Sequence, residues 1–166
     1  ALFLLLSFEI SKVKLKDILR QGRLDYESTY DPYIIAEAGV NHEGSIDTAI
    51  RLIEEAASGG ANAIKFQTYR AHTLASRDSP AYWDTDKEPT ESQFKLFQKY
   101  DSFWEDEFKI IKSHCDEVDI EFLSTPFDLD AAKFLDNLMS VYKISSSDIT
   151  NKPFIEEICK FGKPIL

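Results

Sequence analysis

The sequence predicts an α/β fold built from parallel (β/α) units. Short apolar runs rich in Ile, Ala and Phe recur from Tyr33 onward. Each run is followed by polar or glycine residues, and then by a stretch whose apolar residues have helical spacing. Strands that alternate with helices in this way form parallel sheets, because parallel neighbours need a crossover connection between them.

The first unit consists of a strand over residues 33–39 and a helix over residues 46–57. Ser45 is the expected N-cap of this helix, and Gly59-Gly60 ends it. A second strand covers residues 61–69. A long polar and aromatic excursion over residues 70–100 then precedes the second helix.

A capping box, Ser102-x-x-Glu105, is expected to start that second helix. The later elements are expected as strands over residues 120–127 and 141–148 and a helix over residues 129–138. A fourth helix is opened by Asn151 and Pro153, and a fifth strand begins at residues 165–166.

Four units and the start of a fifth strand amount to half of a TIM barrel, whose eight units need about 250 residues. We therefore expect residues 33–166 to be the first half of a (β/α)8 barrel in a longer protein, with residues 1–32 as an N-terminal extension. The alternative is a small doubly wound sheet. Neither a G-x-G-x-x-G motif nor a P-loop supports that alternative.

Composition excludes several classes of protein. The 166 residues are 43% apolar and carry a net charge of -10, which argues for a folded domain and against binding to nucleic acid. Cys115 and Cys159 show no metal-site or disulfide spacing, which favours reduced thiols and a cytoplasmic location. The apolar run of residues 1–6 is too short to span a membrane, so no membrane partner is expected.

Polar residues near the carboxyl ends of the first two strands are candidates for a site, because barrel enzymes build their sites there. Glu37 interrupts the first strand, and Asn41 and His42 follow it as possible further members. Lys65 and Gln67 lie two residues apart on the second strand and so share a face, where they suit an anionic ligand. A structural ion pair between Lys65 and Glu37, with no ligand, is the alternative.

The third and fourth strands add hydroxyl, cationic and acidic groups. Thr125 is expected to donate a hydrogen bond to a ligand, or to cap the next helix together with Asp128. Lys143, the following serines and Asp148 place a cation, hydroxyl donors and a carboxylate within six residues. No histidine pair has the spacing of a metal site, so we expect no metal centre within this chain.

Four segments, in order and on successive predicted strands, resemble the N-terminal half of the sialic acid synthase family, the N-acetylneuraminate synthases and their relatives. The segments are IIAEAGVNHEGS, AIKFQTY, FLSTPF and YKISSSD-ITN. The resemblance runs from about residue 33 to residue 166, which is about half of a typical member. It implies a (β/α)8 barrel with a small C-terminal antifreeze-like domain, the barrel's second half and that domain being absent here, assembled as a homodimer.

The resemblance also implies an activity. Members condense phosphoenolpyruvate with an N-acetylated sugar aldehyde, typically N-acetylmannosamine, to give a nine-carbon 2-keto acid and phosphate. A divalent metal, Mn or Mg, assists in the full-length protein, with its ligands expected outside this chain. Legionaminic or pseudaminic acid synthesis is an alternative, as is a half-barrel that binds without catalysis. We expect little or no synthase activity from the isolated chain.

Matching positions imply roles for individual residues. Glu37 corresponds to a carboxylate that handles water and protons, and Gln67 to a polar residue of the sugar site. Asp148 falls where many members use Glu to bind the sugar hydroxyls. The positions expected to bind phosphoenolpyruvate are Lys65, Thr125, Lys143 and Ser146.

Overall fold

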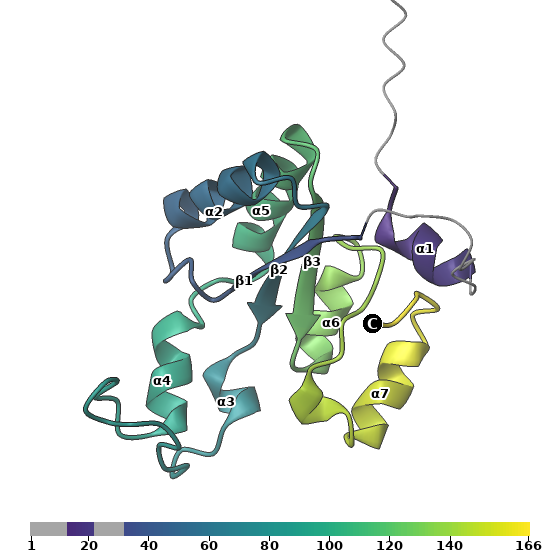
Figure 1. Cartoon of the computed structure of the whole chain (residues 1–166). Helices are drawn as coiled ribbons and strands as arrows, with labels where there is room; N and C mark the ends of the chain where they lie inside the picture. The colour runs from purple at the N-terminus through teal and green to yellow at the C-terminus, as the bar shows by residue number, and fades with distance from the viewer. Residues whose placement is uncertain (1–12, 22–31) are drawn as a thin grey trace, which may run out of the picture.

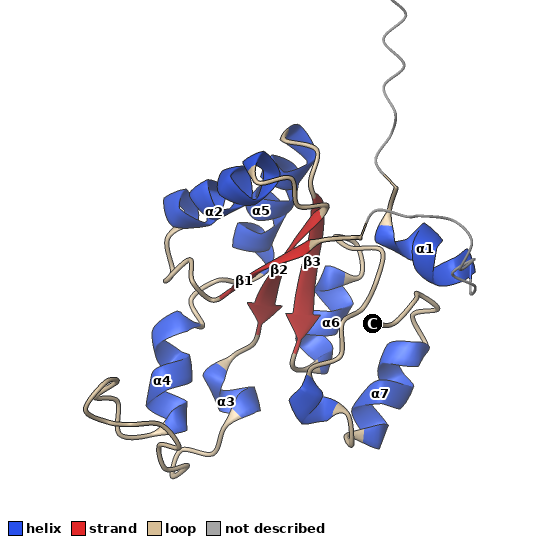
Figure 2. Cartoon of the chain, in the orientation of Figure 1, coloured by secondary structure: helices blue, strands red, loops and turns tan. Residues whose placement is uncertain are grey.

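The computed structural model describes residues 13–21 and 32–166, and its centre is a parallel sheet of three strands (Figures 1 and 2). The strands are β1 (Ile35–Gly39), β2 (Ala63–Thr68) and β3 (Glu121–Pro126), in the order β1-β2-β3. The predicted α/β class with parallel strands is confirmed, while the number of barrel units stays a prediction. The apolar run of residues 1–6 lies outside the described residues.

Two helices, α2 (Ile46–Ser58) and α5 (Glu105–Glu117), cover one face of the sheet (Figure 1). Alternate strand residues such as Ile64, Phe66 and Phe122 point into this layer and are at most 2% exposed. Helix α2 begins as predicted, since the backbone N–H of Thr48 donates to Ser45 Oγ at 3.2 Å. This layer holds the main core and fixes which residues of each strand face the other side.

The opposite face is covered near the amino ends of the strands by α1 (Leu15–Gln21). Leu15 packs there with Ala63 of β2 and Leu123 of β3. The carboxylate of Glu121 accepts hydrogen bonds from the Leu15 backbone N–H at 2.9 Å and the Tyr33 hydroxyl at 2.6 Å. It also accepts one from Ser140 Oγ at 2.9 Å, so a single buried carboxylate joins four segments of the chain.

The excursion contains two helices that the sequence pattern did not indicate, α3 (Ala71–Leu74) and α4 (Gln93–Tyr100). The predicted capping box is wrong by two residues. The N-cap of α5 is Trp104, whose backbone N–H donates to Glu107 Oε2 at 2.9 Å. Ser102 instead lies beside Gly44, where a Cβ would come within 2.8 Å of the Ser102 hydroxyl oxygen.

The predicted fourth strand, residues 141–148, is not a strand of the sheet. Tyr142 forms an isolated parallel bridge with Ile165, and its N–H donates to the Pro164 carbonyl at 2.9 Å. A 3-10 helix, η1 (Ser146–Asp148), follows it. The backbone groups of this segment are thus hydrogen bonded to residues 164–166 rather than to β3, although Val141 still packs against Leu123.

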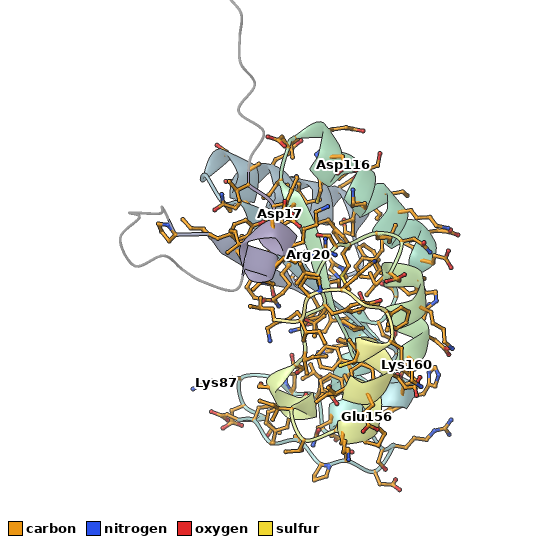
Figure 3. The ribbon with its side chains drawn as sticks, turned by 90° about the vertical axis from the view of Figure 1, so that its right-hand side faces the viewer. Asp17, Arg20, Lys87, Asp116, Glu156 and Lys160 are labelled. Atoms are coloured by element: carbon orange, nitrogen blue, oxygen red, sulfur yellow. The ribbon has the colours of Figure 1, made fainter. Side chains whose placement is uncertain are left out.

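Two further helices complete the described part of the chain. Helix α6 (Leu129–Leu135) is three residues shorter than predicted, and α7 (Lys152–Cys159) is capped by Asn151 as expected. The Lys87 side chain points away from the ribbon (Figure 3), and the Glu156 side chain on α7 is largely exposed. Within the described residues, none of the helices combines the length and apolar character that crossing a bilayer requires.

Candidate functional site

Four of the predicted site residues lie on the face of the sheet that is turned away from α2 and α5. They are Glu37 on β1, Lys65 and Gln67 on β2, and Thr125 on β3. Side chains alternate between the faces of a strand, so all four are opposite to the residues that pack under the helices. We call these four residues the strand-end cluster.

Direct contacts join three members of the cluster. Glu37 and Lys65 are register partners, and Glu37 Oε2 forms an ion pair with Lys65 Nζ. Lys65 Nζ is also 3.5 Å from Thr125 Oγ1. Because the register partner of Lys65 on β3 is Leu123, two residues before Thr125, the lysine side chain leans toward the carboxyl ends of the strands.

Gln67 flanks the same place from the end of β2. A Cβ at Gly39 would lie 3.5 Å from Glu37 Oε1 and 3.8 Å from Gln67 Nε2, so both side chains approach the space beside Gly39. Gly39 has φ +54, a conformation that suits glycine, and the register shifts at this point of β1. The turn therefore leaves the Glu37 carboxylate and the Gln67 amide side by side.

The cluster is open on one side. The Glu37 side chain is 53% exposed, whereas that of Lys65 is 12% exposed. The Lys65 ammonium group, the Thr125 hydroxyl and the Gln67 amide thus lie on one face of the sheet. The accessible carboxylate of Glu37 lies beside them. Ammonium, hydroxyl and amide groups all donate hydrogen bonds to a small anion, and a carboxylate can take up a proton.

The structure separates the two roles considered for Thr125. Asp128 Oδ1 accepts the Ala131 backbone N–H at 2.7 Å, so Asp128 is the N-cap of α6. Thr125 faces Lys65 instead and is 3% exposed. Its hydroxyl is thus part of the strand-end cluster and does not cap the helix.

The remaining predicted residues lie on neighbouring loops. Lys143 Nζ donates to the Ile144 carbonyl, and within the described residues no contact links it to the strand-end cluster. Asp148 accepts from Asn151 Nδ2 at 3.1 Å, Ser146 is exposed on η1, and Asn41 is exposed in the turn after β1. Within the part of the chain that the structure describes, no hydrogen bond or ion pair joins these loop residues to the strand-end cluster.

His42 lies on the other side of the sheet from the cluster. Its ring stacks on Phe103 at a centroid distance of 4.0 Å and also contacts Phe66, which points toward the helices. Nδ1 accepts the Gly44 backbone N–H at 3.1 Å, and the residue is 1% exposed. Burial lowers the pKa of His42 to about 4, so we describe it as a neutral packing residue.

This burial predicts a pH dependence of stability. The pKa of His42 falls from 6.5 to about 4 on folding. The contribution of the neutral, buried imidazole to the free energy of unfolding is therefore complete above pH 6.5 and is lost as pH falls toward 4. The loss amounts to about 3 kcal/mol at most. Urea unfolding of the wild type and of His42→Asn between pH 7.5 and 4.5 measures it. The variant, which does not titrate there, should show the smaller slope, whereas equal slopes would contradict this role.

The described residues do not fit a metal centre. Within residues 13–21 and 32–166, no group of three or more His, Cys, Asp or Glu side chains gathers as ligands would. Glu37 is paired with Lys65, and the His42 imidazole is stacked within the core.

Some residues that hold distant segments together could not be identified from the sequence pattern. Glu121 lies at the amino end of its strand, where a charged residue is ordinarily read as solvent exposed, and only the fold brings its three donors together. Burial, followed by the hydrogen bond to Glu121, raises the pKa of Tyr33, which keeps its hydroxyl a donor. Asp101 and Arg70 likewise meet across 31 residues of chain.

Comparison with known proteins identifies relatives of the chain. The N,N'-diacetyllegionaminic acid synthase of Campylobacter jejuni is 39% identical over 80% of this chain and 40% of that protein. The N-acetylneuraminate-9-phosphate synthase of Mus musculus is 32% identical over 81% of the chain and 38% of that protein. The chain thus spans about two fifths of the length of these curated relatives.

A solved structure supports the same relationship. The N-acetylneuraminic acid synthetase of Leptospira borgpetersenii, crystallised in complex with citrate, is 34% identical, with a TM-score of 0.69 over 81% of this chain and 44% of that one. The family model described as the NeuB family matches residues 52–166. These residues include β2, β3 and every helix from α3 to α7. The chain therefore belongs to the NeuB family.

Proposed function

We propose that the protein to which this chain belongs condenses phosphoenolpyruvate with an N-acylated amino sugar aldehyde. The product is a nine-carbon 2-keto acid of the sialic or nonulosonic acid type, and phosphate is released. The observation that carries the proposal is the strand-end cluster, in which Lys65 contacts both Glu37 and Thr125 at the carboxyl ends of parallel strands. Its place agrees with the general location of sites in this class of fold.

Phosphoenolpyruvate presents a phosphate and a carboxylate, and both need cations or hydrogen-bond donors. Lys65 supplies a cation held in a mostly buried position, and Thr125 supplies a hydroxyl beside it. In a chain with a net charge of -10, such a local cation is needed to offset repulsion of the substrate. We assign Lys143 and Ser146 to the same substrate as additional donors from the neighbouring loop.

The reaction forms one bond between the enol carbon C3 and the aldehyde carbon. The aldehyde oxygen takes up a proton and becomes a hydroxyl, while water adds to C2 and loses its first proton. The C2–O bond to phosphate then breaks, and the second proton of that water leaves with the phosphate as C2 becomes a ketone. Glu37 is the accessible carboxylate of the cluster, and we assign it to accept the first proton of the attacking water. Gln67 lies beside it at the end of β2, where an amide can orient a sugar hydroxyl, and Asp148 is assigned to the same substrate.

Several related acylamino sugars are candidates for the sugar substrate. The relative from Campylobacter jejuni is named an N,N'-diacetyllegionaminic acid synthase, and the mouse relative is named an N-acetylneuraminate-9-phosphate synthase. The higher identity to the former favours a diacetylated bacterial sugar as the second candidate. We also propose that the working protein is a cytoplasmic dimer that uses Mn or Mg through residues outside this chain.

A direct assay tests the reaction. The whole protein is incubated with Mn, phosphoenolpyruvate and each of a panel: N-acetylmannosamine, its 6-phosphate, and the diacetylated precursors of legionaminic and pseudaminic acids. We expect keto acid and phosphate to appear in equal amounts with at least one sugar, and with none when the sugar is omitted. Binding of phosphoenolpyruvate without turnover on the whole panel would instead support a non-catalytic binding module.

A further inference from the structure

The excursion between β2 and α5 is closed at its base by contacts between its two ends. Asp101 Oδ2 accepts the backbone N–H of Ala71 at 2.8 Å. Arg70 donates from Nη1 to the carbonyl oxygen of Asp101, and its guanidinium lies 4.5 Å from the centre of the Trp104 ring. Residues 70–71 are thus held against the segment that starts α5. We call these contacts the base latch.

The base latch is continuous with the ends of β2 and β3. Tyr69 is 5% exposed and makes edge contacts with Phe97 on α4 and Phe127 after β3, at centroid distances of 5.6 and 5.9 Å. Thr73 on α3 donates to Asp128 Oδ2 at 2.7 Å. Helices α3 and α4 accordingly lie beyond the carboxyl end of β2 (Figure 1).

These contacts lie close to one half of the strand-end cluster. Gln67 is three residues before Arg70, so the backbone at the end of β2 leads directly into the base latch. Lys65 lies two residues farther from the strand end and is held separately by Glu37 and Thr125. Release of the latch therefore loosens Gln67 more than Lys65, because strand ends open before strand centres.

We propose that Asp101 is a positioning residue for the sugar substrate. It touches no reacting group, but its carboxylate holds Ala71 and thereby fixes the strand end that carries Gln67. The inference rests on the proposed function, in which Gln67 orients the sugar while Lys65 binds phosphoenolpyruvate. It predicts that loss of the latch affects the two substrates unequally.

Three variants of the whole protein test this role. Asp101→Ala removes the acceptor, whereas Asp101→Asn keeps an amide oxygen that can accept the same N–H. Asp106→Ala is the control, since that side chain is 91% exposed on the first turn of α5. We expect Asp101→Ala to raise the KM for the sugar about tenfold and that for phosphoenolpyruvate less than about twofold, as loss of one charge-assisted hydrogen bond would. Asp101→Asn should restore most of the difference, and Asp106→Ala should match the wild type.

Hydrogen exchange without substrates separates the latch from the reaction. The amide of Ala71 should exchange at least about tenfold faster in Asp101→Ala than in the wild type or Asp101→Asn. Unchanged exchange, or an equal rise in both KM values, would overturn the proposal while leaving the proposed function intact. A wild type without synthase activity would overturn the proposed function and the positioning role together, and the exchange data would still report on the latch. If Asp101→Ala fails to fold, Arg70→Lys tests the latch from its other side, because it loses the planar contact with Trp104 and keeps the charge. It should also raise the KM for the sugar more than that for phosphoenolpyruvate, and an equal rise in both would overturn the positioning role.

Discussion

Replacing Lys65 with Met should reduce synthase activity of the whole protein between about thirtyfold and several thousandfold. This range corresponds to about 2–5 kcal/mol, the usual cost of removing one partner of a desolvated charge contact, here that between Lys65 and bound phosphoenolpyruvate. Met keeps the apolar stem of the side chain but removes the only cation that contacts both Glu37 and Thr125 among the described residues. Calorimetry with phosphoenolpyruvate should show a matching loss of affinity.

Two further variants make this result specific. Lys109→Met removes an exposed cation of α5 that pairs with Glu105 at 2.9 Å, and it should leave activity unchanged. Glu37→Gln should lower turnover and retain phosphoenolpyruvate binding, since it removes a proton acceptor and also a carboxylate that competes for Lys65. Because Glu37 is half exposed, water can solvate it when Lys65 is lost, and Lys65→Met should remain folded. Wild-type affinity in folded Lys65→Met would exclude the assigned role.

Replacing Glu121 with Ala should lower the free energy of unfolding by about 3–5 kcal/mol. The buried carboxylate accepts three hydrogen bonds, from Leu15, Tyr33 and Ser140, and Ala leaves all three donors without their acceptor. The loss also weakens the attachment of α1 to the sheet, since packing of Leu15 against Ala63 remains but its hydrogen bond to Glu121 does not. Urea unfolding followed by circular dichroism measures the effect.

The matched variant Glu121→Gln separates hydrogen bonding from volume. Its amide oxygen can still accept two bonds, and Ser140 can turn its hydroxyl to accept from the amide nitrogen. We expect a cost of about 1–2 kcal/mol for this change. Glu156→Ala on the exposed face of α7 should cost less than about 0.5 kcal/mol. Equal costs for Glu121→Ala and Glu121→Gln would show that these hydrogen bonds contribute little.

The strands β1 to β3 and the helix α2 could be predicted from sequence because local signals agree there. The apolar run of β2, the Ser45 cap and the spacing of α2 all depend on near neighbours. The fourth strand could not be predicted correctly, since its β pattern is local but its hydrogen-bond partner is not. The backbone of residues 142–144 forms its hydrogen bonds with residues 164–166, where a fourth strand of the sheet would form them with β3.

The strand-end cluster was predictable in part for a similar reason. Alternation along a strand places Lys65 and Gln67 on one face, and parallel strands bring Glu37 and Thr125 to the same end. Alternation does not place loop residues, so Lys143 could not be located this way. Contacts across 30 residues or more, such as Asp101 with Ala71, depend on how the chain closes and leave no periodic trace.

A crystal structure of the whole protein with bound phosphoenolpyruvate tests the central claim most directly. The account predicts that an anionic group of the ligand lies within about 3 Å of Lys65 Nζ, with Thr125 Oγ1 as a further donor and Glu37 facing C2. Phosphoenolpyruvate bound elsewhere, with the ion pair of Lys65 and Glu37 undisturbed and no ligand atom near Thr125, would contradict it.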